Sequence, residues 1–252
     1  MKVVLIGSGN VATQLGIALQ KSKHKIVQVF GRNISSTKTL SKKLSCDYTT
    51  HINSISGEAD IYIIALRDEA IKPFLGKFSS TDKLVVHTSG SIPLKVFGRK
   101  FKNCGVLYPV QTFSVERKID FKNIPVCIEA GNDVSKRKIV QLVKTITTET
   151  HFINSEKRKK IHLAAVFANN FTNHLFSIAE NILSGEKLSF DLIRPIILET
   201  ALKVQSASPI KMQTGPAKRG DKAVIKEHLK MLKDKRKFQR IYKLITESIL
   251  KY

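Results

Sequence analysis

The sequence predicts an α/β fold in which a doubly wound, mostly parallel sheet is followed by an all-α C-terminal domain. The chain begins with an apolar run, Val3 to Ile6, that suits a strand covered on both faces, and a glycine turn and an apolar-periodic segment follow it. Strand and helix patterns then alternate as far as residue 154. Only helical patterns occur from Ser155 onward, so we expect two domains, residues 1–154 and 155–252.

The first turn has the spacing G-x-G-x-x-A, with Gly7, Gly9 and Ala12 as its small residues. Gly7 permits a tight turn, Gly9 lets a pyrophosphate approach the backbone, and Ala12 lets the helix pack closely. Because the pattern follows a strand and opens a helix, it predicts a Rossmann dinucleotide site, rather than glycines that serve geometry alone. The expected cofactor contacts of this turn are Gly7, Ser8, Gly9, Asn10, Val11 and Ala12.

The second strand pattern, Ile26 to Phe30, ends where a Rossmann unit meets the adenosine ribose. An acidic residue at this point selects an unphosphorylated 2′-hydroxyl, and this segment has none. It has Arg32, Asn33 and Ser35 instead, which favour a 2′-phosphate through charge-assisted hydrogen bonds. We therefore expect the cofactor to be NADP; the alternative is that Arg32 is an ordinary surface arginine of a basic chain.

Two further strand patterns, residues 59–66 and 83–87, each end in a polar segment. Ligands of doubly wound sheets bind beyond the carboxyl ends of the strands. Leu66, Arg67 and Asp68 are therefore expected to contact the cofactor, and His87 to Ser91 to border the nicotinamide. The other elements expected in this half are helices at 37–44 and 134–147, strands at 105–108 and 124–129, and short extended pieces at 47–50 and 151–154.

The helical half opens with a long helix expected from Ser155, its N-cap, to about Leu183. At about 100° per residue, one arc of this helix is apolar and is expected to be core. It consists of Leu163, Phe167, Phe171, Leu175, Ile178 and Ile182. The opposite stripe contains His162, Asn169, Asn173 and Glu180 and no lysine or arginine, which predicts a polar cleft or a subunit contact instead of a solvated face.

Two more features stand out near the C-terminus. A helix over residues 190–205 is followed by the loop Gln213–Asp221, which contains Arg219. Asp221 can cap the next helix, whose apolar face includes His228, so this side chain is expected to point inward. A histidine that belongs only to the core is the alternative interpretation of His228. The last helix, residues 238–250, is expected to serve packing.

The composition is strongly basic, with a formal net charge of +23. The lysine runs at 157–160 and 233–237 have no interleaved aromatic residues, so they indicate solvated helix faces, and nucleic-acid binding is the weakest interpretation. No apolar stretch has the length of a membrane span, and the three cysteines form no C-x-x-C pair. These features favour a cytoplasmic protein with unpaired thiols.

Taken together, the motifs resemble bacterial oxidoreductases with a Rossmann-like N-terminal domain and a helical C-terminal domain of unknown function. The motifs are the Gly7 turn, the His87–Ser91 strand end, Tyr108–Phe113, His162–Phe171, and Thr214–Pro216 with Arg219–Asp221 and His228. The resemblance implies kinship with 6-phosphogluconate dehydrogenase, the β-hydroxyacid dehydrogenases and pyrroline-5-carboxylate reductase. It also implies NADP on the first domain, a substrate between the two domains, and a homodimer.

One position departs from the related enzymes. The β-hydroxyacid dehydrogenases have a catalytic lysine three residues before a paired Asn-Asn on the long helix. Asn169 and Asn170 match the pair, but Val166 occupies the lysine position. Lysine-assisted hydride transfer is therefore not available to this chain from that position.

The function favoured by the sequence is an NADP-dependent oxidoreductase that acts on a small carbonyl or imine. A histidine titrates near neutral pH, and we expect His162, then His228, as the proton donor. His87 is a third candidate, or a strand-end residue that bonds locally. Groups that could orient an anionic substrate are Asn169, Asn170, Ser89 and Arg219. The rival hypothesis, favoured by Val166, is a protein that binds NADPH as a ligand or redox signal without turnover.

Overall fold

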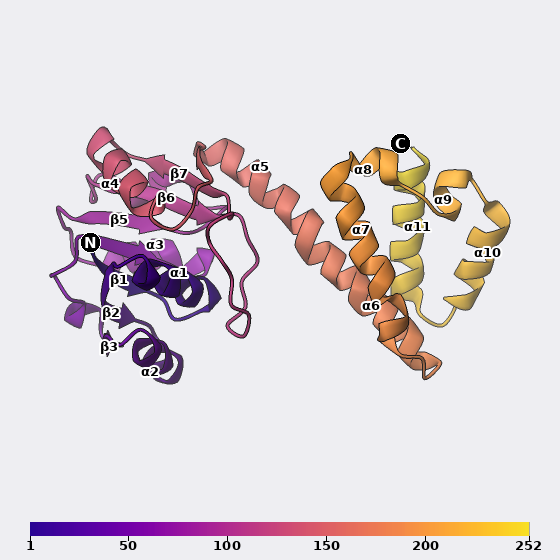
Figure 1. Ribbon diagram of the computed structural model, residues 1–252, viewed down its shortest axis with the longest axis horizontal. Helices are drawn as coiled ribbons and strands as arrows, with labels where there is room; N and C mark the ends of the chain where they lie inside the picture. The colour runs from indigo at the N-terminus through magenta and orange to yellow at the C-terminus, as the bar shows by residue number, and fades with distance from the viewer. Residues whose placement is uncertain (252) are drawn as a thin grey trace. The chain divides into compact units, whose positions relative to one another are not determined.

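The computed structural model describes residues 1–251, which form two compact units, Met1–Asn169 and a second unit that begins at Asn170 (Figure 1). The division lies within a run of helical residues that begins at Ser155. The domain boundary expected after residue 154 stays a prediction. No helix within residues 1–251 is long and apolar enough to span a membrane.

The first unit is built on an eight-stranded sheet with the order β3-β2-β1-β4-β5-β6-β7-β8. Within the described residues only β6 and β7 pair antiparallel, so the expected doubly wound, mostly parallel sheet is confirmed. The strands are β1 Lys2–Ile6, β2 Lys25–Phe30, β3 Asp47–Thr49, β4 Ile61–Ile64, β5 Leu84–His87, β6 Cys104–Pro109, β7 Val126–Ala130 and β8 Thr150–Phe152.

The central strand β1 is buried on both faces because its side chains alternate between two hydrophobic clusters. Val3 and Leu5 belong to one cluster, and Val4 and Ile6 to the other. Helices cover the sheet on both sides (Figure 1). They are α1 Asn10–Lys21, α2 Ile34–Lys43, α3 Asp68–Lys77 and α4 Asp133–Val143, with short 3₁₀ turns at Ile52–Ser54 and Leu94–Phe97.

Helix α4 ends four residues before the predicted end at Thr147. The segment after Val143 turns back toward the chain that precedes β7, where the Thr147 hydroxyl donates to the Ile124 carbonyl at 2.7 Å. A hydrogen bond of this kind competes with continuation of the helix. Helical periodicity of the side chains does not show such a bond, so the predicted end was wrong.

The helical part of the chain begins with α5, Ser155–Ala165, and the expected long helix is interrupted by a π-helical segment, Val166–Phe171. The N-cap of α5 is Asn154 and not Ser155, because the Asn154 side chain accepts from the Lys157 N–H at 2.9 Å. The second unit continues with α6 Thr172–Gly185, a 3₁₀ turn Phe190–Ile193, α7 Arg194–Ser206, α8 Pro209–Met212, α9 Pro216–Arg219, α10 Lys222–Met231 and α11 Arg236–Leu250. Asp221 caps α10 as expected.

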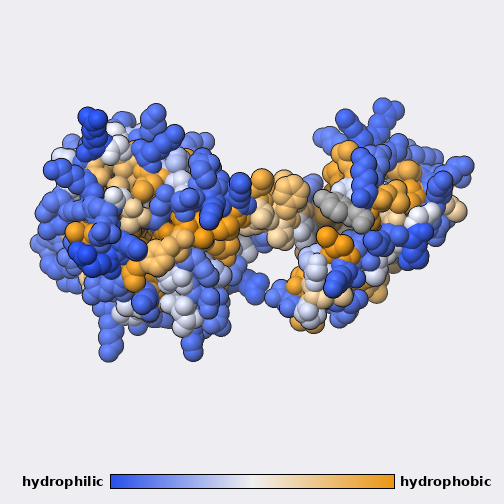
Figure 2. Space-filling model, turned by 90° about the horizontal axis from the view of Figure 1, so that it is seen from above, coloured by the Kyte–Doolittle hydropathy of each residue, from blue (hydrophilic) through white to orange (hydrophobic). Residues whose placement is uncertain are grey.

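Most of the apolar arc expected as core is exposed in the single chain, and only Ile178 of its six residues is half-buried. Leu163 is 58% exposed, Phe167 62% and Phe171 50%. An amphipathic pattern predicts that an apolar stripe is covered, but it does not say by which chain. The core assignment is therefore wrong in the chain alone for the five exposed residues of the arc. Hydrophobic side chains are visible on the molecular surface in Figure 2.

The glycine turn tolerates a methyl group at Gly9 but not at Gly7. Gly7 has a φ of +125°, and a Cβ there would lie 2.3 Å from the Ala65 carbonyl oxygen, whereas a Cβ on Gly9 would meet nothing within 4 Å. We predict that Gly7→Ala lowers the free energy of unfolding by about 2–5 kcal/mol, through backbone strain and overpacking. Gly9→Ala is the matched control and should stay within about 0.5 kcal/mol of wild type. Thermal unfolding of both variants measures this, and equal stabilities would contradict it.

Candidate functional site

The carboxyl ends of β1, β4 and β5 lie together at one edge of the sheet. Ile6 pairs with Ile64, and Ile64 pairs with His87, so the residues that follow each strand emerge side by side. The Ala65 N–H donates to the Ile6 carbonyl, and the Thr88 N–H donates to the Ile64 carbonyl. The structure therefore brings the glycine turn, residues 65–68 and residues 88–91 to the same edge, where doubly wound sheets bind ligands.

The start of α1 is tied to the loop that follows β6. Asn10 Nδ2 donates to the Phe113 carbonyl at 2.8 Å, and Gln14 Nε2 donates to the carbonyls of Ser114 and Arg117. This loop, residues 110–125, therefore borders the glycine turn. Asn10 is among the expected cofactor contacts, but its side-chain amide has a protein partner, which leaves its backbone N–H for an anion. Gln14 was not singled out from the sequence.

The ribose-binding segment is organised by the start of α2. Asn33 is the N-cap of this helix and accepts from the Ser36 N–H at 3.0 Å. Ser8 of the glycine turn reaches the same place, because its Oγ lies 2.8 Å from Ser36 Oγ. Arg32 and Ser35 are exposed beside them. The segment thus combines a guanidinium, hydroxyl groups and the positive end of a helix, which suits a phosphate.

His162 lies within the first unit, in contact with two of the sequence motifs. Its Nδ1 is 3.1 Å from Tyr108 Oη, and the two rings meet edge to face. A Cβ on Gly90 would lie 2.7 Å from His162 Cγ, so the backbone at Gly90 packs directly against the imidazole. Burial raises the pKa of Tyr108, with smaller contributions from Cys127 and Asp68, and Arg158 opposes the rise. Tyr108 is therefore a neutral phenol beside His162.

His87 is buried and uncharged. Its side chain has no exposed surface, its Nδ1 accepts from the Ser89 N–H at 3.2 Å, and its ring stacks on Phe97. Burial, reinforced by the charge of Arg158, lowers the pKa of His87 to about 3 against the opposing effect of the Pro93 carbonyl. At neutral pH this ring holds no extra proton, which favours the local hydrogen-bonding interpretation of His87 over a proton donor.

The other expected site residues have these surroundings. Ser89 is buried, and its Oγ accepts from the N–H groups of Ser91 and Ile92. Asn169 and Asn170 are exposed and lie in the π-helical segment, a local geometry that is frequent at functional sites. In the second unit, His228 Nδ1 lies 2.9 Å from Tyr242 Oη, which gives this histidine a partner within the helical unit, and Arg219 is exposed at the end of α9.

Sequence reasoning missed Tyr108 as an individual site residue and missed Arg158 altogether. Tyr108 was noted only as part of a motif, and Arg158 lies in a lysine run that indicated a solvated face. Arg158 is nevertheless fully buried, with its guanidinium bonded to Glu129 and to the Ile92 carbonyl. The available signal was its spacing: Arg158 precedes His162 by four residues and so shares a helix face with it.

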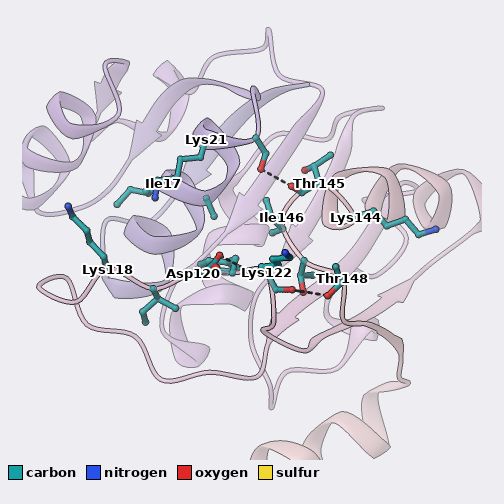
Figure 3. A pocket seen from close by; sticks show the side chains of 14 residues that line it. Ile17, Lys21, Lys118, Asp120, Lys122, Lys144, Thr145, Ile146 and Thr148 are labelled. Carbon is teal, nitrogen blue, oxygen red and sulfur yellow. Dashed lines mark hydrogen bonds between the residues drawn. The ribbon is translucent and has the colours of Figure 1, made fainter.

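One cavity of about 500 Å³ lies away from this edge (Figure 3). It is lined by the carboxyl ends of α1 and α4 and by lysine side chains, among them Lys21, Lys122 and Lys144. The negative ends of two helix dipoles disfavour an anion there and account for the lysines. The candidate site is therefore the strand-end edge with His162, and not this cavity.

Comparisons with known proteins identify two family models along the chain. Residues 2–90 match a family described as NADP oxidoreductase, coenzyme F420-dependent, and residues 124–249 match a domain of unknown function, DUF2520. No curated protein matches the chain. A Bacteroides fragilis protein, provisionally named as an NADP oxidoreductase, is 41% identical, with a TM-score of 0.96 over 100% of this chain and 98% of that one.

More distant structures share the fold. A Thermotoga maritima protein is 21% identical, with a TM-score of 0.72 over 98% of this chain and 96% of that one. The 1-pyrroline-5-carboxylate reductase of Streptococcus pyogenes is 12% identical, with a TM-score of 0.67 over 100% and 99% of the two chains. The chain thus belongs to the family that joins an N-terminal domain of the NADP oxidoreductase type to the C-terminal domain DUF2520.

Proposed function

We propose that the protein is an NADP-dependent oxidoreductase that transfers a hydride to or from a small carbonyl or imine. The observation that carries this proposal is the placement of His162, bonded to Tyr108 and packed on Gly90. Gly90 follows β5 at the sheet edge that also carries the glycine turn. A titratable group next to a dinucleotide-binding edge is what reduction of a polar double bond requires.

The residues of the edge fit the cofactor. Space beside Gly9 is open, since a Cβ there would meet nothing within 4 Å, and the N–H groups that start α1 can bind a pyrophosphate. The expected contacts Gly7, Ser8, Val11, Ala12, Leu66, Arg67 and Asp68 belong to this edge or its turns. When bound, NADP supplies the hydride chemistry, and the protein orients the substrate and handles the proton.

The proton would pass through His162. A histidine that acts as an acid starts as imidazolium, with a proton on each ring nitrogen, so Nδ1 of His162 would donate to Tyr108 Oη. Nε2 would then give its proton to the carbonyl oxygen or imine nitrogen of a substrate during reduction, and the ring would be left as neutral imidazole with its remaining proton on Nδ1. Asn169, Asn170 and Arg219 remain our candidates for orienting an anionic substrate, and His228 is the second candidate for the proton.

One sequence position bears on the second candidate function, and one exposed surface bears on the oligomeric state. Val166 leaves the helix without the lysine of the β-hydroxyacid dehydrogenases, which favours an NADPH-binding protein without turnover as the second candidate function. Helix α7 exposes large apolar side chains, and Ile196, Leu198 and Leu202 are 65%, 61% and 55% exposed. Exposed apolar side chains that lie close together mark interaction surfaces, so we propose that a second copy of the chain covers them in a homodimer.

We predict that Arg32→Ala weakens NADPH binding about 10- to 100-fold, because a charge-assisted contact to the 2′-phosphate is lost. The affinity for NADH, which has no such phosphate, should stay the same. Lys38→Ala, an exposed lysine of α2, is the control for general loss of positive charge. Fluorescence titration with both nucleotides measures these affinities. Equal weakening of NADPH and NADH binding, or tight NADH binding by wild type, would contradict the NADP assignment.

His162→Gln is predicted to lower kcat about 10²- to 10⁴-fold, since general acid catalysis contributes a factor of that size. The dissociation constant for NADPH should change less than about twofold. The assay follows NADPH oxidation with a panel of small keto acids, aldehydes and imines, and His51→Gln, at an exposed histidine with no proposed role, is the matched control. A loss of this size in His228→Gln instead would assign the proton to His228. Full turnover by His162→Gln would remove His162 from the mechanism. NADPH binding by wild type with no oxidation by any compound would favour the second candidate function.

Sedimentation equilibrium tests the homodimer. The wild-type protein is predicted to sediment at twice its chain mass of 28.2 kDa. Ile196→Asp combined with Leu202→Asp should give a monomer, because two buried carboxylates in an apolar interface cost far more than they gain. Glu199→Gln on the same helix is the control and should remain dimeric. A monomeric wild-type protein at micromolar concentration would contradict the proposal.

A further inference from the structure

Arg158 is the one lysine or arginine among the described residues that is buried, with no exposed side-chain surface. Removing a charge from water is expensive, so a buried guanidinium is retained where its contacts specify a structure. The proposed mechanism does not use Arg158. Its contacts show what the side chain specifies.

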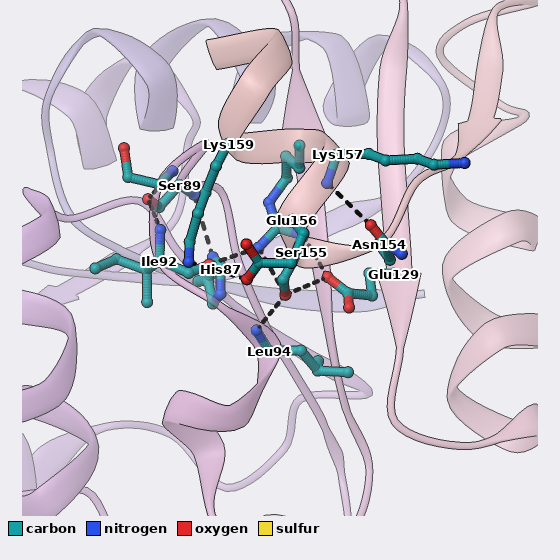
Figure 4. Close-up of polar contacts among 12 residues, drawn as sticks. His87, Ser89, Ile92, Leu94, Glu129, Asn154, Ser155, Glu156, Lys157 and Lys159 are labelled. Atoms are coloured by element: carbon teal, nitrogen blue, oxygen red, sulfur yellow. Dashed lines mark hydrogen bonds and ion pairs between the residues drawn. The ribbon is translucent and has the colours of Figure 1, made fainter. Parts of the chain in front are cut away.

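The guanidinium joins three segments of the first unit. Nη1 donates to the Glu129 carboxylate on β7, and Nη2 donates to the Ile92 carbonyl at 2.5 Å. Ser155 completes the cluster, because its Oγ donates to Glu129 Oε2 at 2.8 Å and accepts from the Leu94 N–H at 2.9 Å (Figure 4). The start of α5 is thereby attached both to β7 and to the chain that follows β5.

His162 and Gly90, which contact each other, both lie in segments that Arg158 holds. His162 lies four residues further along α5, on the same face of the helix. Gly90 lies in the turn Ser89–Ile92, which is held at one end by Ser89 Oγ and at the other by the bond from Arg158 to the Ile92 carbonyl. A single side chain thus fixes the helix that carries the imidazole and the turn on which the imidazole rests.

We infer that Arg158 is the positioning residue that holds the His162 ring against Gly90 and within hydrogen-bond distance of Tyr108. An arginine suits this task, because its planar fork binds a carboxylate and a carbonyl in two fixed directions. A lysine ammonium offers no such fork. The same charge also opposes the rise in the pKa of Tyr108 and adds to the effect of burial in lowering the pKa of His87. The role of Arg158 in catalysis rests on the proposed function, but its effect on the His162 ring does not.

The test measures the His162 ring directly, by NMR of protein with ¹⁵N-labelled histidine. His162→Gln assigns the His162 signals, and Tyr108→Phe gives their position when the hydrogen bond is lost. In Arg158→Met the His162 signals are expected to move at least halfway to their Tyr108→Phe position. Lys160→Met, an exposed neighbour on α5, is the matched control and should leave them unchanged. The His228 signals, which report a ring bonded to Tyr242, should be unchanged throughout.

Folded Arg158→Met protein with wild-type His162 signals would overturn the inference. Should Arg158→Met fail to fold, Arg158→Lys keeps the charge without the fork and is expected to shift the His162 signals in the same direction. Wild-type signals in folded Arg158→Lys would then overturn the inference as well. NADPH affinity should change less than about twofold in either variant. Failure of the wild-type protein to bind NADPH would refute the proposed function and leave the His162 result standing.

Discussion

The close passage of Gly7 over the Ala65 carbonyl is the constraint on which the site depends. The chain must leave β1 with a φ of +125° and with no side chain, because the end of β4 lies directly beneath. This turn leads into α1 at Asn10, and the first N–H groups of a helix have no partner within it, so they are available to an anion. The same sheet register brings residues 65–68 and 88–91 to that edge, so the proposed cofactor contacts and Gly90, against which His162 packs, lie at one edge of the sheet.

The three histidines proposed from the sequence differ in their surroundings. His87 lies in the core with its pKa lowered to about 3, and a ring that stays neutral at pH 7 serves packing and local hydrogen bonding. His228 is bonded to Tyr242 inside the helical unit. His162 combines a phenol partner with a backbone contact at the strand-end edge. We therefore assign the proposed proton transfer to His162 because of its neighbours, and not because of its residue type.

Local patterns predicted much of this structure because they act over a few residues. The strand and glycine turn at Val3–Ala12 and the Asp221 cap follow from periodicity and short-range geometry, and the structure confirms them. The contact of Tyr108 with His162 could not be found in this way, since the two residues lie 54 positions apart in sequence. The spacing of Arg158 from His162 indicates a shared helix face, but it does not show the burial of Arg158, because Glu129 and Ile92 lie 29 and 66 residues away. The exposed arc at Leu163 shows the same limit: periodicity identifies an apolar face, but the covering surface is a property of the assembly.

The measurement that tests the central claim most directly is a crystal structure of the protein with NADPH bound. The account predicts that the pyrophosphate lies on the N–H groups after Gly7 and that the nicotinamide lies beside Gly90. Of the three candidate histidines, His162 should then be the one nearest to C4 of the nicotinamide. A nicotinamide ring nearer to His228 or His87, or a nucleotide bound away from the glycine turn, would contradict it.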